Sequence, residues 1–482
     1  ISGSYAWTPK DKDDKVEEGF EFAMSVTRLK EAPRVTKPYT DDQWRAIDSL
    51  GKRIDRDLRE WDVRLTMGGE PTFVSADERD APEWNVAALG PRKRARGVAL
   101  LKRLRDRFAP GGLLHYGQGK WYPGEPLPRW AFGCYWRTDG EPIWRDRALT
   151  ADEDRPYGFG SDDAARFARA LAESLGIDPK YAIPGYEDAW YYLWKERRLP
   201  ANVDPLRSKL DSEEDRARLA RVFEQGLGSA VGTILPLRKG VGWESGPWAL
   251  RSAHLFLIPG DSPMGFRLPL DSLGWEEPAA RQFMDPRDPF APRGPLPRFQ
   301  ASGGRQPPEA VPTHVRESGL TSGLTPGLGR LTPPARPDGL VRTALCVEPR
   351  GGTLHVFLPP ARTLEDYLEL VAAVEATAAK LDRPVLIEGY KPPHDHRVNS
   401  FSVTPDPGVI EANMHPAGSW DELVHITTTL YAEARHAGLC AEKFMLDGRH
   451  TGTGGGNHVV LGGPTPADSP LLRRPDLLKS LV

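Results

Sequence analysis

The sequence predicts an α+β fold in which an antiparallel β-sheet is flanked by helices. Two observations support this prediction. From residue 339 onward, short β-branched runs alternate with two long helical segments, a spacing that suits a sheet covered by helices. The chain also has 482 residues, of which 39% are hydrophobic, so it can bury a large core.

The first 60 residues are predicted to form an N-terminal segment followed by a helix. Residues 1–40 are charged and polar with little periodicity, whereas apolar residues recur at spacings of three and four over residues 39–58. Alternating apolar residues then predict a strand over residues 63–67, which ends at two glycines and Glu70.

Residues 61–275 are predicted to form the first part of the main domain, with a large insertion of helices and strands. Strands are expected at residues 112–121, 130–136 and 251–260, and amphipathic helices at residues 88–108, 161–177 and 212–228. The first of these helices is basic, a composition that is typical of a solvated outer face.

Residues 276–338 are rich in Pro, Gly, Ser and Arg and are interpreted as a flexible linker or insertion. Residues 339–482 contain the alternating elements. Strands are expected at residues 341–349, 353–359, 383–390, 408–416, 441–446 and 457–463, and helices at residues 363–381 and 419–438. Ser419 and Glu422 have the spacing of a capping box at the start of the second helix.

The charge and cysteine content argue against several classes of protein. Lys and Arg total 64 and Asp and Glu total 67, so no net field favours a nucleic acid or a membrane as partner. The three cysteines, Cys134, Cys346 and Cys440, form no CxxC pair and no even disulfide framework. No run of 18 apolar residues and no signal-peptide pattern occurs, so a cytoplasmic location is expected.

The most informative stretch is DGRHTGTGGGNHVVLGG, residues 447–463, which joins a cationic pair to a glycine loop and a strand bearing a histidine. Glycines let backbone N–H groups approach an anion closely, although many glycine-rich loops are plain turns. No GxxxxGK[ST] pattern occurs, and a β-branched run follows the glycines where a helix would be needed. The loop is therefore neither a P-loop nor a dinucleotide fingerprint.

Four acidic or imidazole residues occupy strand positions where a core would hold apolar side chains: Glu70, Glu388, Glu411 and His458. Buried carboxylates that converge on one sheet imply a cation between them. Oxygen ligands with one imidazole suit Mg²⁺ or Mn²⁺ better than structural zinc. For each glutamate alone, an exposed position at a strand end is the competing interpretation.

The order of these motifs resembles the glutamine synthetase superfamily: GGEPTFV at residues 68–74, Glu388, IEAN at residues 410–413, a helix, AEKFML, the glycine loop and Asn457-His458. More closely, residues 60–482 resemble the amidoligases found fused or adjacent to bacterial transglutaminase-like proteins. The resemblance implies a curved antiparallel sheet of glutamine synthetase-like type. It also implies ATP-dependent amide formation through an acyl phosphate, with ATP and Mg²⁺ or Mn²⁺ as cofactors.

Residue by residue, the resemblance places Glu70, Glu388, Glu411 and His458 on the family's metal ligands. Arg449 and His450 are the implied catalytic residues, with Arg449 neutralising the transferred phosphoryl group. The implied cofactor-binding residues are Gly454, Gly455, Gly456, Asn457, Lys120 and Asn413. The substrates would be a carboxylate and an amine, with peptides and proteins among the candidates. A transglutaminase-like protein or fused domain is the implied partner.

Two departures from the family pattern bear on the number of metals and the completeness of the site. Thr72 stands where the family has a second glutamate in its first strand. The chain also ends at Val482, before the arginine-bearing strand and last glutamate that the family places beyond the histidine. The resemblance therefore implies that the sheet is incomplete at its C-terminal side.

Other functions and residues stay open at the level of the sequence. A catalytically degenerate module that binds a nucleotide or partner, and a metal-dependent amide hydrolase, are the alternative functions. Arg129 is a further candidate for phosphate or carboxylate binding, and His415 lies beside Glu411, but loop and turn roles explain both about as well. His394 and His396 are interpreted as part of a solvated loop, and the aromatic run at residues 188–198 as packing.

Overall fold

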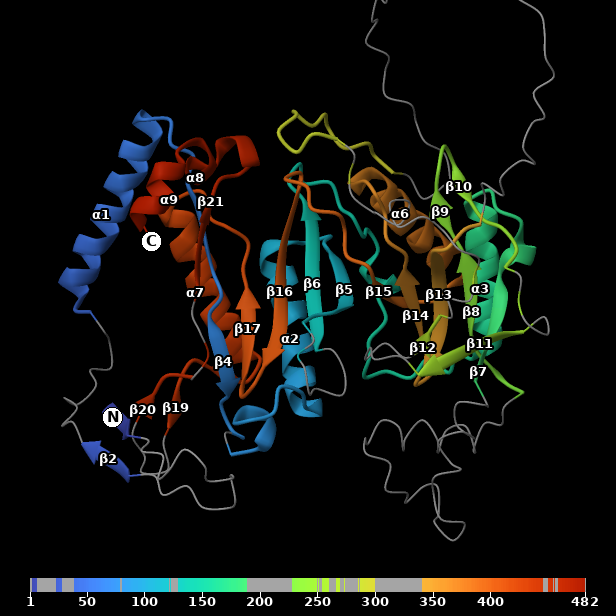
Figure 1. The fold of residues 1–482 in the computed structure, drawn as a ribbon, viewed down its shortest axis with the longest axis horizontal. Helices are drawn as coiled ribbons and strands as arrows, with labels where there is room; N and C mark the ends of the chain where they lie inside the picture. Colours follow the sequence, from blue (N-terminus) through green and yellow to red (C-terminus); the bar gives the residue numbers. More distant parts are fainter. Residues whose placement is uncertain are drawn as a thin grey trace, which may run out of the picture.

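The computed structural model describes residues 2–6, 23–27, 39–78, 80–120, 122, 129–188, 228–248, 250, 254–259, 266–268, 273, 285, 287–299, 340–444, 450–453, 455 and 458–481. Two sheets of six and seven strands lie side by side, each with its own helices and its own apolar core (Figure 1). Within the described residues, no helix combines the length and the apolar character needed to cross a membrane.

The six-stranded sheet is antiparallel throughout and combines early and late parts of the chain. Its strands are, in spatial order, β18 (Leu439–Cys440), β4 (Thr72–Ser75), β17 (Val409–Asn413), β16 (Val398–Asp406), β6 (Trp130–Arg137) and β5 (Leu113–Gln118). In Figure 1 the blue β4 therefore stands next to the orange β17.

Helices α2 (Pro91–Phe108) and α7 (Trp420–His436) cover one face of this sheet. Proline at the first position of α2 suits a helix start because its missing N–H would have no partner there. Leu100, Leu101 and Leu104 of α2 are fully buried, and each such side chain stabilises the fold by about 1.5–3 kcal/mol. The opposite face of the sheet carries polar side chains.

The seven-stranded sheet is mixed. Its strands are, in spatial order, β12 (Phe266–Arg267), β11 (Leu255–Pro259), β7 (Ile183–Glu187), β8 (Ala230–Pro236), β13 (Ala344–Arg350), β14 (Thr353–Leu358) and β15 (Val385–Gly389). Helices α3 (Ser161–Ser174) and α6 (Leu364–Leu381) pack on it. β15 also lies beside β5, so the two sheets meet at these strands.

The expected antiparallel arrangement therefore holds for the six-stranded sheet and is wrong for parts of the other one. β14 pairs with β15, and β11 with β7, in parallel. The first case has a simple cause, because α6 joins β14 to β15 and such a crossover returns the chain in the same direction. The structure is an α/β mixture, and the glutamine synthetase-like fold stays a prediction.

The other elements within the described residues are small ribbons, helices and 3-10 turns. The small ribbons are β1 (Ser2–Ala6) with β2 (Ala23–Thr27), β9 (Arg238–Lys239) with β10 (Trp243–Glu244), β19 (Lys443–Phe444) with β20 (His450–Thr451), and β3 (Thr66–Gly69) with β21 (Val459–Gly462). The remaining helices are α1 (Asp41–Glu60), α8 (Pro470–Arg473) and α9 (Pro475–Leu481), with 3-10 turns at Pro82–Trp84, Arg147–Leu149, Pro179–Tyr181 and Pro466–Asp468.

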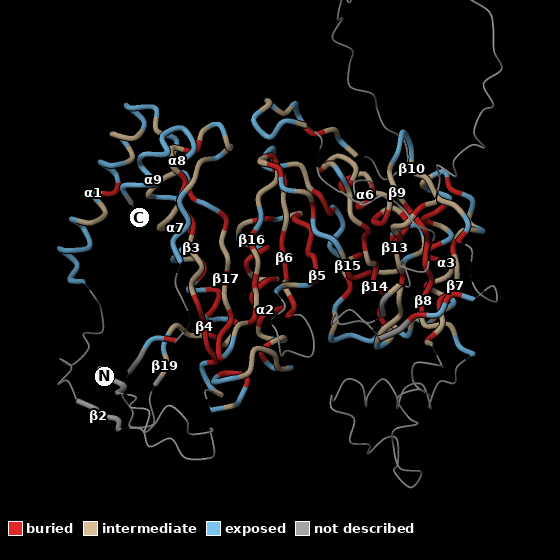
Figure 2. The backbone as a smooth tube through the Cα atoms, in the orientation of Figure 1, coloured by how far each residue is buried: buried red, intermediate tan, exposed pale blue. Residues whose placement is uncertain are grey.

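Helix α1 lies outside both cores and is held by a specific contact with α7. Gly51 lies against the Trp420 indole, where an added Cβ would be 2.2 Å from the ring, and Trp420 Nε1 donates to Asp48 Oδ1 at 2.9 Å. Figure 2 shows the buried residues concentrated in the sheets and their covering helices, whereas α1 is mostly exposed.

Most predicted elements within the described residues are confirmed, but several details differ. The helix at residues 212–228 and most of the aromatic run at residues 188–198 lie outside the described residues. The nine-residue strand β16 was not predicted. The basic helix α2 is not simply a solvated face, because Lys93 on it is fully buried. Ser419 accepts from the Glu422 amide as expected, but Glu422 accepts from the Gly418 amide instead of closing the box on Ser419.

Both sheets contain strands from before and after residues 276–338. The predicted division into residues 1–60, 61–275, 276–338 and 339–482 therefore describes order along the chain, and it stays a prediction as a set of folding units.

Candidate functional site

Strand alternation places Glu411 on the open face of the six-stranded sheet, the face that α2 and α7 do not cover. Ile410 and Ala412 of β17 are fully buried in the core beneath those helices, so Glu411 and Asn413 point to the other side. In the ladder, Glu411 stands opposite Thr404 of β16 and opposite Thr72 of β4. Side chains from three strands therefore meet there.

A short chain of hydrogen bonds links these side chains. Asn413 Nδ2 donates to Thr404 Oγ1 at 3.2 Å, and Thr404 Oγ1 donates to Glu411 Oε2 at 3.4 Å. The predicted cofactor-binding residue Asn413 thus lies in the same cluster as the predicted metal ligand Glu411.

Negative charge accumulates around Glu411. Burial raises the pKa of this carboxyl, and the carboxylates of Asp406 and Glu70 raise the pKa further, while Lys120 and the Thr404 hydroxyl oppose them. The structure therefore brings together Glu411, Glu70 and Lys120, three of the residues predicted from the sequence. An ion between the carboxylates would relieve their repulsion.

The hairpin of β5 and β6 contributes cations to this region. Lys120, which is exposed, follows β5, and its carbonyl accepts from the Arg129 amide at 2.9 Å. Arg129 is buried, forms an ion pair with Asp406, and stacks 4.3 Å from the centre of the Tyr122 ring. Arg129 is therefore anchored by Asp406, whereas Lys120 is exposed near Glu411.

A buried lysine fixes the turn that carries Asp406. Lys93 Nζ donates to the carbonyls of Ala87, Ala88 and Asp406 at 2.8, 3.1 and 2.9 Å. Burial lowers the pKa of Lys93 to about 7, with Arg129 and Lys443 lowering it and Glu83 and Asp406 opposing them. Because its three N–H groups bind carbonyls and its side chain is inaccessible, Lys93 holds the β16–β17 turn and does not face a ligand.

The predicted glycine loop reaches the same face. The Glu70 amide donates to the His458 carbonyl at 3.1 Å, and His458 Nδ1 lies 2.9 Å from Glu70 Oε2. The ladder of β21 with β3 begins directly after this contact. The structure therefore brings His458 beside Glu70, two of the predicted metal ligands, and metal binding by them stays a prediction.

Part of the loop lies outside the described residues, namely Arg449, Gly454, Gly456 and Asn457. Of His450, only the backbone is described, in β20. Thr453 and Gly455 are described, and both lie against Thr72: the two threonine hydroxyls are 2.5 Å apart, and a Cβ on Gly455 would be 2.8 Å from Thr72 Cγ2.

The structure does not bring Glu388 to this cluster. Glu388 lies on β15 in the other sheet, where it forms an ion pair with Arg350 of β13 and lies 2.9 Å from His355 Nδ1 of β14. Four strand spacings separate β15 from β17, roughly 19 Å at about 4.8 Å per spacing. Burial opposes ionisation, but Arg350 and His355 outweigh it and hold the pKa of Glu388 at about 2. Its charge is balanced by the protein itself.

The residues that do lie near Glu411 have the donor atoms that a divalent cation needs, but their side chains are not arranged around a common point. Glu411, Glu70 and Asp406 offer the oxygen donors that Mg²⁺ prefers, and burial together with the two neighbouring carboxylates raises the pKa of Glu411. In the part of the chain that the structure describes, however, no three His, Cys, Asp or Glu side chains are gathered closely enough to hold an ion. Glu70 and Asp406 would have to leave His458 and Arg129.

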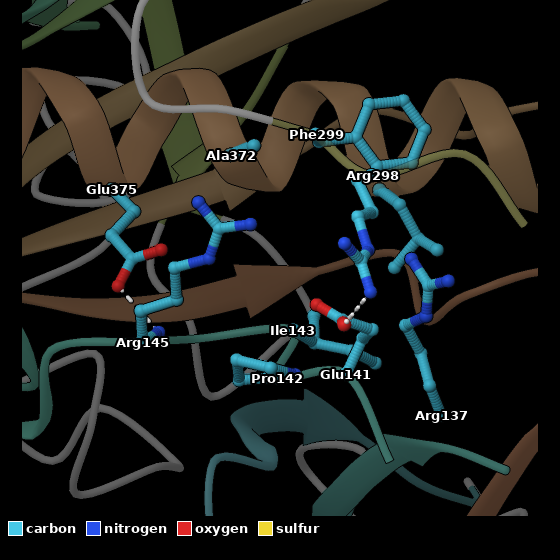
Figure 3. A pocket seen from close by; sticks show the side chains of 10 residues that line it. Arg137, Glu141, Pro142, Ile143, Arg145, Arg298, Phe299, Ala372 and Glu375 are labelled. Carbon is cyan, nitrogen blue, oxygen red and sulfur yellow. Dashed lines mark hydrogen bonds and ion pairs between the residues drawn. The ribbon is translucent and has the colours of Figure 1, made fainter. Parts of the chain in front are cut away.

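The two described hollows contain none of these residues. One is a cavity of about 20 Å³ under α6, room for about one water, where Glu375 accepts from the amides of Arg145 and Asp146 and Arg298 pairs with Glu141 (Figure 3). The other is an open hollow of about 630 Å³ beside α3, lined in part by Arg166, Arg169 and Lys380. Neither coincides with the carboxylate cluster, whose residues occupy an open sheet face.

The sequence analysis missed Asp406, Thr404 and Thr453, and it described the role of His415 incompletely. Asp406 precedes Pro407 and Gly408, a turn signal that could have marked a strand end next to Glu411. His415 is more than a turn residue: it is buried between Phe108 and Trp136, at ring distances of 5.2 and 5.0 Å. Burial also raises the pKa of Cys346 to about 12, which disfavours a reactive thiolate there.

Comparison with models of protein families matches residues 14–482, nearly the whole chain, to the family described as "Putative amidoligase enzyme (DUF2126)". No curated protein and no solved structure matches the chain.

Proposed function

This chain belongs to the amidoligase enzyme family, and we propose that it is an ATP- and Mg²⁺-dependent ligase that joins a carboxylate to an amine on the open face of the six-stranded sheet. Membership of the family suggests formation of an amide bond. The observation that supports this location is the position of Glu411 opposite Thr72, on which the glycine loop rests, together with the influence of the Asp406 and Glu70 carboxylates on its pKa.

Glu411, Glu70 and His458 are the residues proposed to hold Mg²⁺ or Mn²⁺, with Asp406 as the additional oxygen ligand that the structure offers in place of Glu388. When bound, the ion would neutralise phosphate oxygens of ATP, so that a substrate carboxylate can be phosphorylated and then attacked by an amine.

The other proposed roles belong to residues around this cluster. Lys120 is exposed near Glu411, and its ammonium would bind phosphate oxygens of the nucleotide. Asn413, whose amide nitrogen already donates to Thr404, would hold the threonine hydroxyl toward Glu411. Arg449 keeps its sequence-based role in neutralising the phosphoryl group, and His450 stays a catalytic candidate. The glycine loop would line the nucleotide.

We propose the substrates by chemical class only: one is a carboxylate and the other an amine. One of the two would be a peptide or a protein. The part of the sheet that would receive them is the polar face of β16 and β17, where Ser402, Thr404, Glu411 and Asn413 are half-buried. A transglutaminase-like partner is likewise a proposal that rests on the sequence resemblance.

A catalytically degenerate nucleotide-binding module is the second candidate, and specific observations favour it. Glu70 is hydrogen-bonded to His458, and Thr72 occupies a position where a further carboxylate would strengthen the site. A protein of this kind would bind nucleotide without turning it over.

The test is phosphate release from ATP by the full chain with Mg²⁺, with and without a mixture of carboxylates and amines. The ligase predicts release that requires both substrates and is lost in Glu411→Gln. Glu369→Gln, a half-buried glutamate on α6 that binds Lys239 and Trp243, is the matched control and keeps activity. Nucleotide binding without turnover would support the degenerate module, and amide cleavage without ATP would support a metal-dependent hydrolase.

A further inference from the structure

We propose that Thr72 and Thr453 form a hydroxyl latch that holds the glycine loop on the sheet, and that this latch sets the affinity of the site for the phosphate groups of a nucleotide. The affinity part of the inference rests on the proposed function, whereas the holding of the loop can be tested by itself.

The latch is a buried hydrogen bond between two distant parts of the chain. Thr72 begins β4 and is 2% exposed, and Thr453 is 7% exposed. Their Oγ1 atoms lie 2.5 Å apart. Loss of either hydroxyl would leave its partner buried without that hydrogen bond, which costs more than the bond itself contributes.

The same threonine also supports the loop by packing. A Cβ on Gly455 would lie 2.8 Å from Thr72 Cγ2 and 3.1 Å from Thr72 Cβ, so the glycine backbone rests directly on this side chain. Thr72 thus bonds one loop residue through its hydroxyl and supports another through its methyl group.

The latch lies between two ladders that fix the ends of the loop. At one end, Lys443 pairs with Thr451 in the β19–β20 ribbon, and at the other, Val459 pairs with Gly69. Between them, the described side-chain attachments to the sheet are Thr453 to Thr72 and His458 to Glu70. A bound cation would recruit Glu70 and His458, so the threonine pair is the attachment that persists when the site is filled.

The position of the latch connects loop order to the site. Thr72 stands directly opposite Glu411 in the β4–β17 ladder, so the residue that anchors the loop is the neighbour of the central carboxylate. A loop that is already ordered loses less conformational freedom when it closes on a phosphate group. Thr72 and Thr453 are therefore positioning residues for nucleotide binding, and they make no contact with the reacting atoms.

The experiment uses variants that remove a hydroxyl but keep the shape: Thr72→Val and Thr453→Val, singly and together, with Thr72→Ser retaining the hydroxyl. Thr377→Val is the matched control, because Thr377 is equally buried and bonds only to the Ala373 carbonyl within α6. Two properties are measured: calorimetric binding of ATP with Mg²⁺, and hydrogen exchange of residues 450–458 without nucleotide.

We expect each valine variant to weaken ATP binding by roughly five- to tenfold, the effect of about one buried hydrogen bond, and to speed exchange of the loop. In turnover, the KM for ATP rises while kcat is preserved. The double variant is no weaker than the single ones. Thr72→Ser keeps the hydroxyl but loses the methyl group beneath Gly455, so it weakens binding less than Thr72→Val does. If Thr72→Val prevents folding, Thr453→Val tests the same bond from the loop side.

Unchanged loop exchange in both valine variants overturns the latch. Faster exchange with unchanged ATP affinity overturns its role in binding. If the unmodified protein binds no ATP, the proposed function fails, and the exchange measurement still decides whether the latch holds the loop.

Discussion

Glu388 and Glu411 are both glutamates in short apolar strands, but they lie in opposite electrostatic surroundings. Around Glu388, β13 and β14 supply Arg350 and His355, which hold its pKa at about 2 despite burial. Around Glu411, β16 and the β3–β4 link supply Asp406 and Glu70, which together with burial raise its pKa. The first carboxylate is balanced from within the protein, and the second is the one at which we propose that a cation binds.

We interpret Glu388 as a structural charge and propose Glu411 as a functional one. Glu388 is 5% exposed and lies where the two sheets meet, beside the buried His115 of β5. Glu411 is half-buried on an open sheet face next to the glycine loop. Removing the charge should therefore affect stability at the first position and ligand binding at the second.

The largest expected effect on stability follows from Glu388→Gln. The substitution removes the nearest counterion of the partly buried Arg350 and leaves the Glu348 carboxylate at 4.0 Å, so we expect a cost of up to about 3–5 kcal/mol in the free energy of unfolding. Urea denaturation measures the loss. Glu411→Gln is the matched variant, and a comparable loss there would contradict the assignment of Glu411 to an unbalanced site.

A second prediction uses the pH dependence of stability to test Lys93, the buried lysine that holds the β16–β17 turn. The folded pKa of Lys93 is about 7 against 10.5 for an ordinary lysine, so between these values the unfolded chain binds a proton that the folded chain does not. Stability should rise from pH 7 to pH 9 and fall as the pH returns toward 7, by about 1 kcal/mol per pH unit from this group.

Lys93→Met should remove that part of the slope, as measured by denaturation at several pH values. The charged or titratable groups that face this ammonium are Glu83, Arg129, Asp406 and Lys443, and all remain in the variant. An unchanged slope would show that Lys93 is not the group that titrates between pH 7 and pH 9.

The two histidines give the smallest contrast in stability. His355 is buried and bonded to Glu388, so His355→Ala should cost about 1–3 kcal/mol and leave metal binding intact at temperatures where the variant is folded. The His458 side chain is 68% exposed, so His458→Ala should change stability by no more than about 0.5 kcal/mol while weakening Mn²⁺ binding. Thermal denaturation and metal titration of both variants check whether His355→Ala lowers stability alone and His458→Ala lowers Mn²⁺ affinity alone.

Much of the fold could be predicted because its elements carry strong local signals. Helices α1, α3, α6 and α7 have helical periodicity and polar residues near their first turns, and β14 and β17 are β-branched runs. β16 was missed because Ser and Thr alternate along it, since its open face is polar, and because proline interrupts it. Parallel pairing depends on which strands become neighbours, and local patterns do not encode this.

The candidate site could be predicted only for residues that belong to recognisable sequence motifs. Glu70 and His458 lie at the ends of strands that pair with each other, and both belong to motifs. Glu388 looked equivalent to Glu411 because both follow apolar residues in short strands. The difference comes from Arg350 and His355 on neighbouring strands, and no spacing along the chain shows that these face Glu388.

The most direct test of the contrast is a calorimetric titration of Mn²⁺ with a non-hydrolysable ATP analogue into the unmodified protein, Glu411→Gln and the control Glu369→Gln. The structure predicts metal-dependent binding by the unmodified protein and the control, and loss of that binding in Glu411→Gln with its stability unchanged. Equal binding by Glu411→Gln would contradict the claim that the open face of the six-stranded sheet is the metal and nucleotide site.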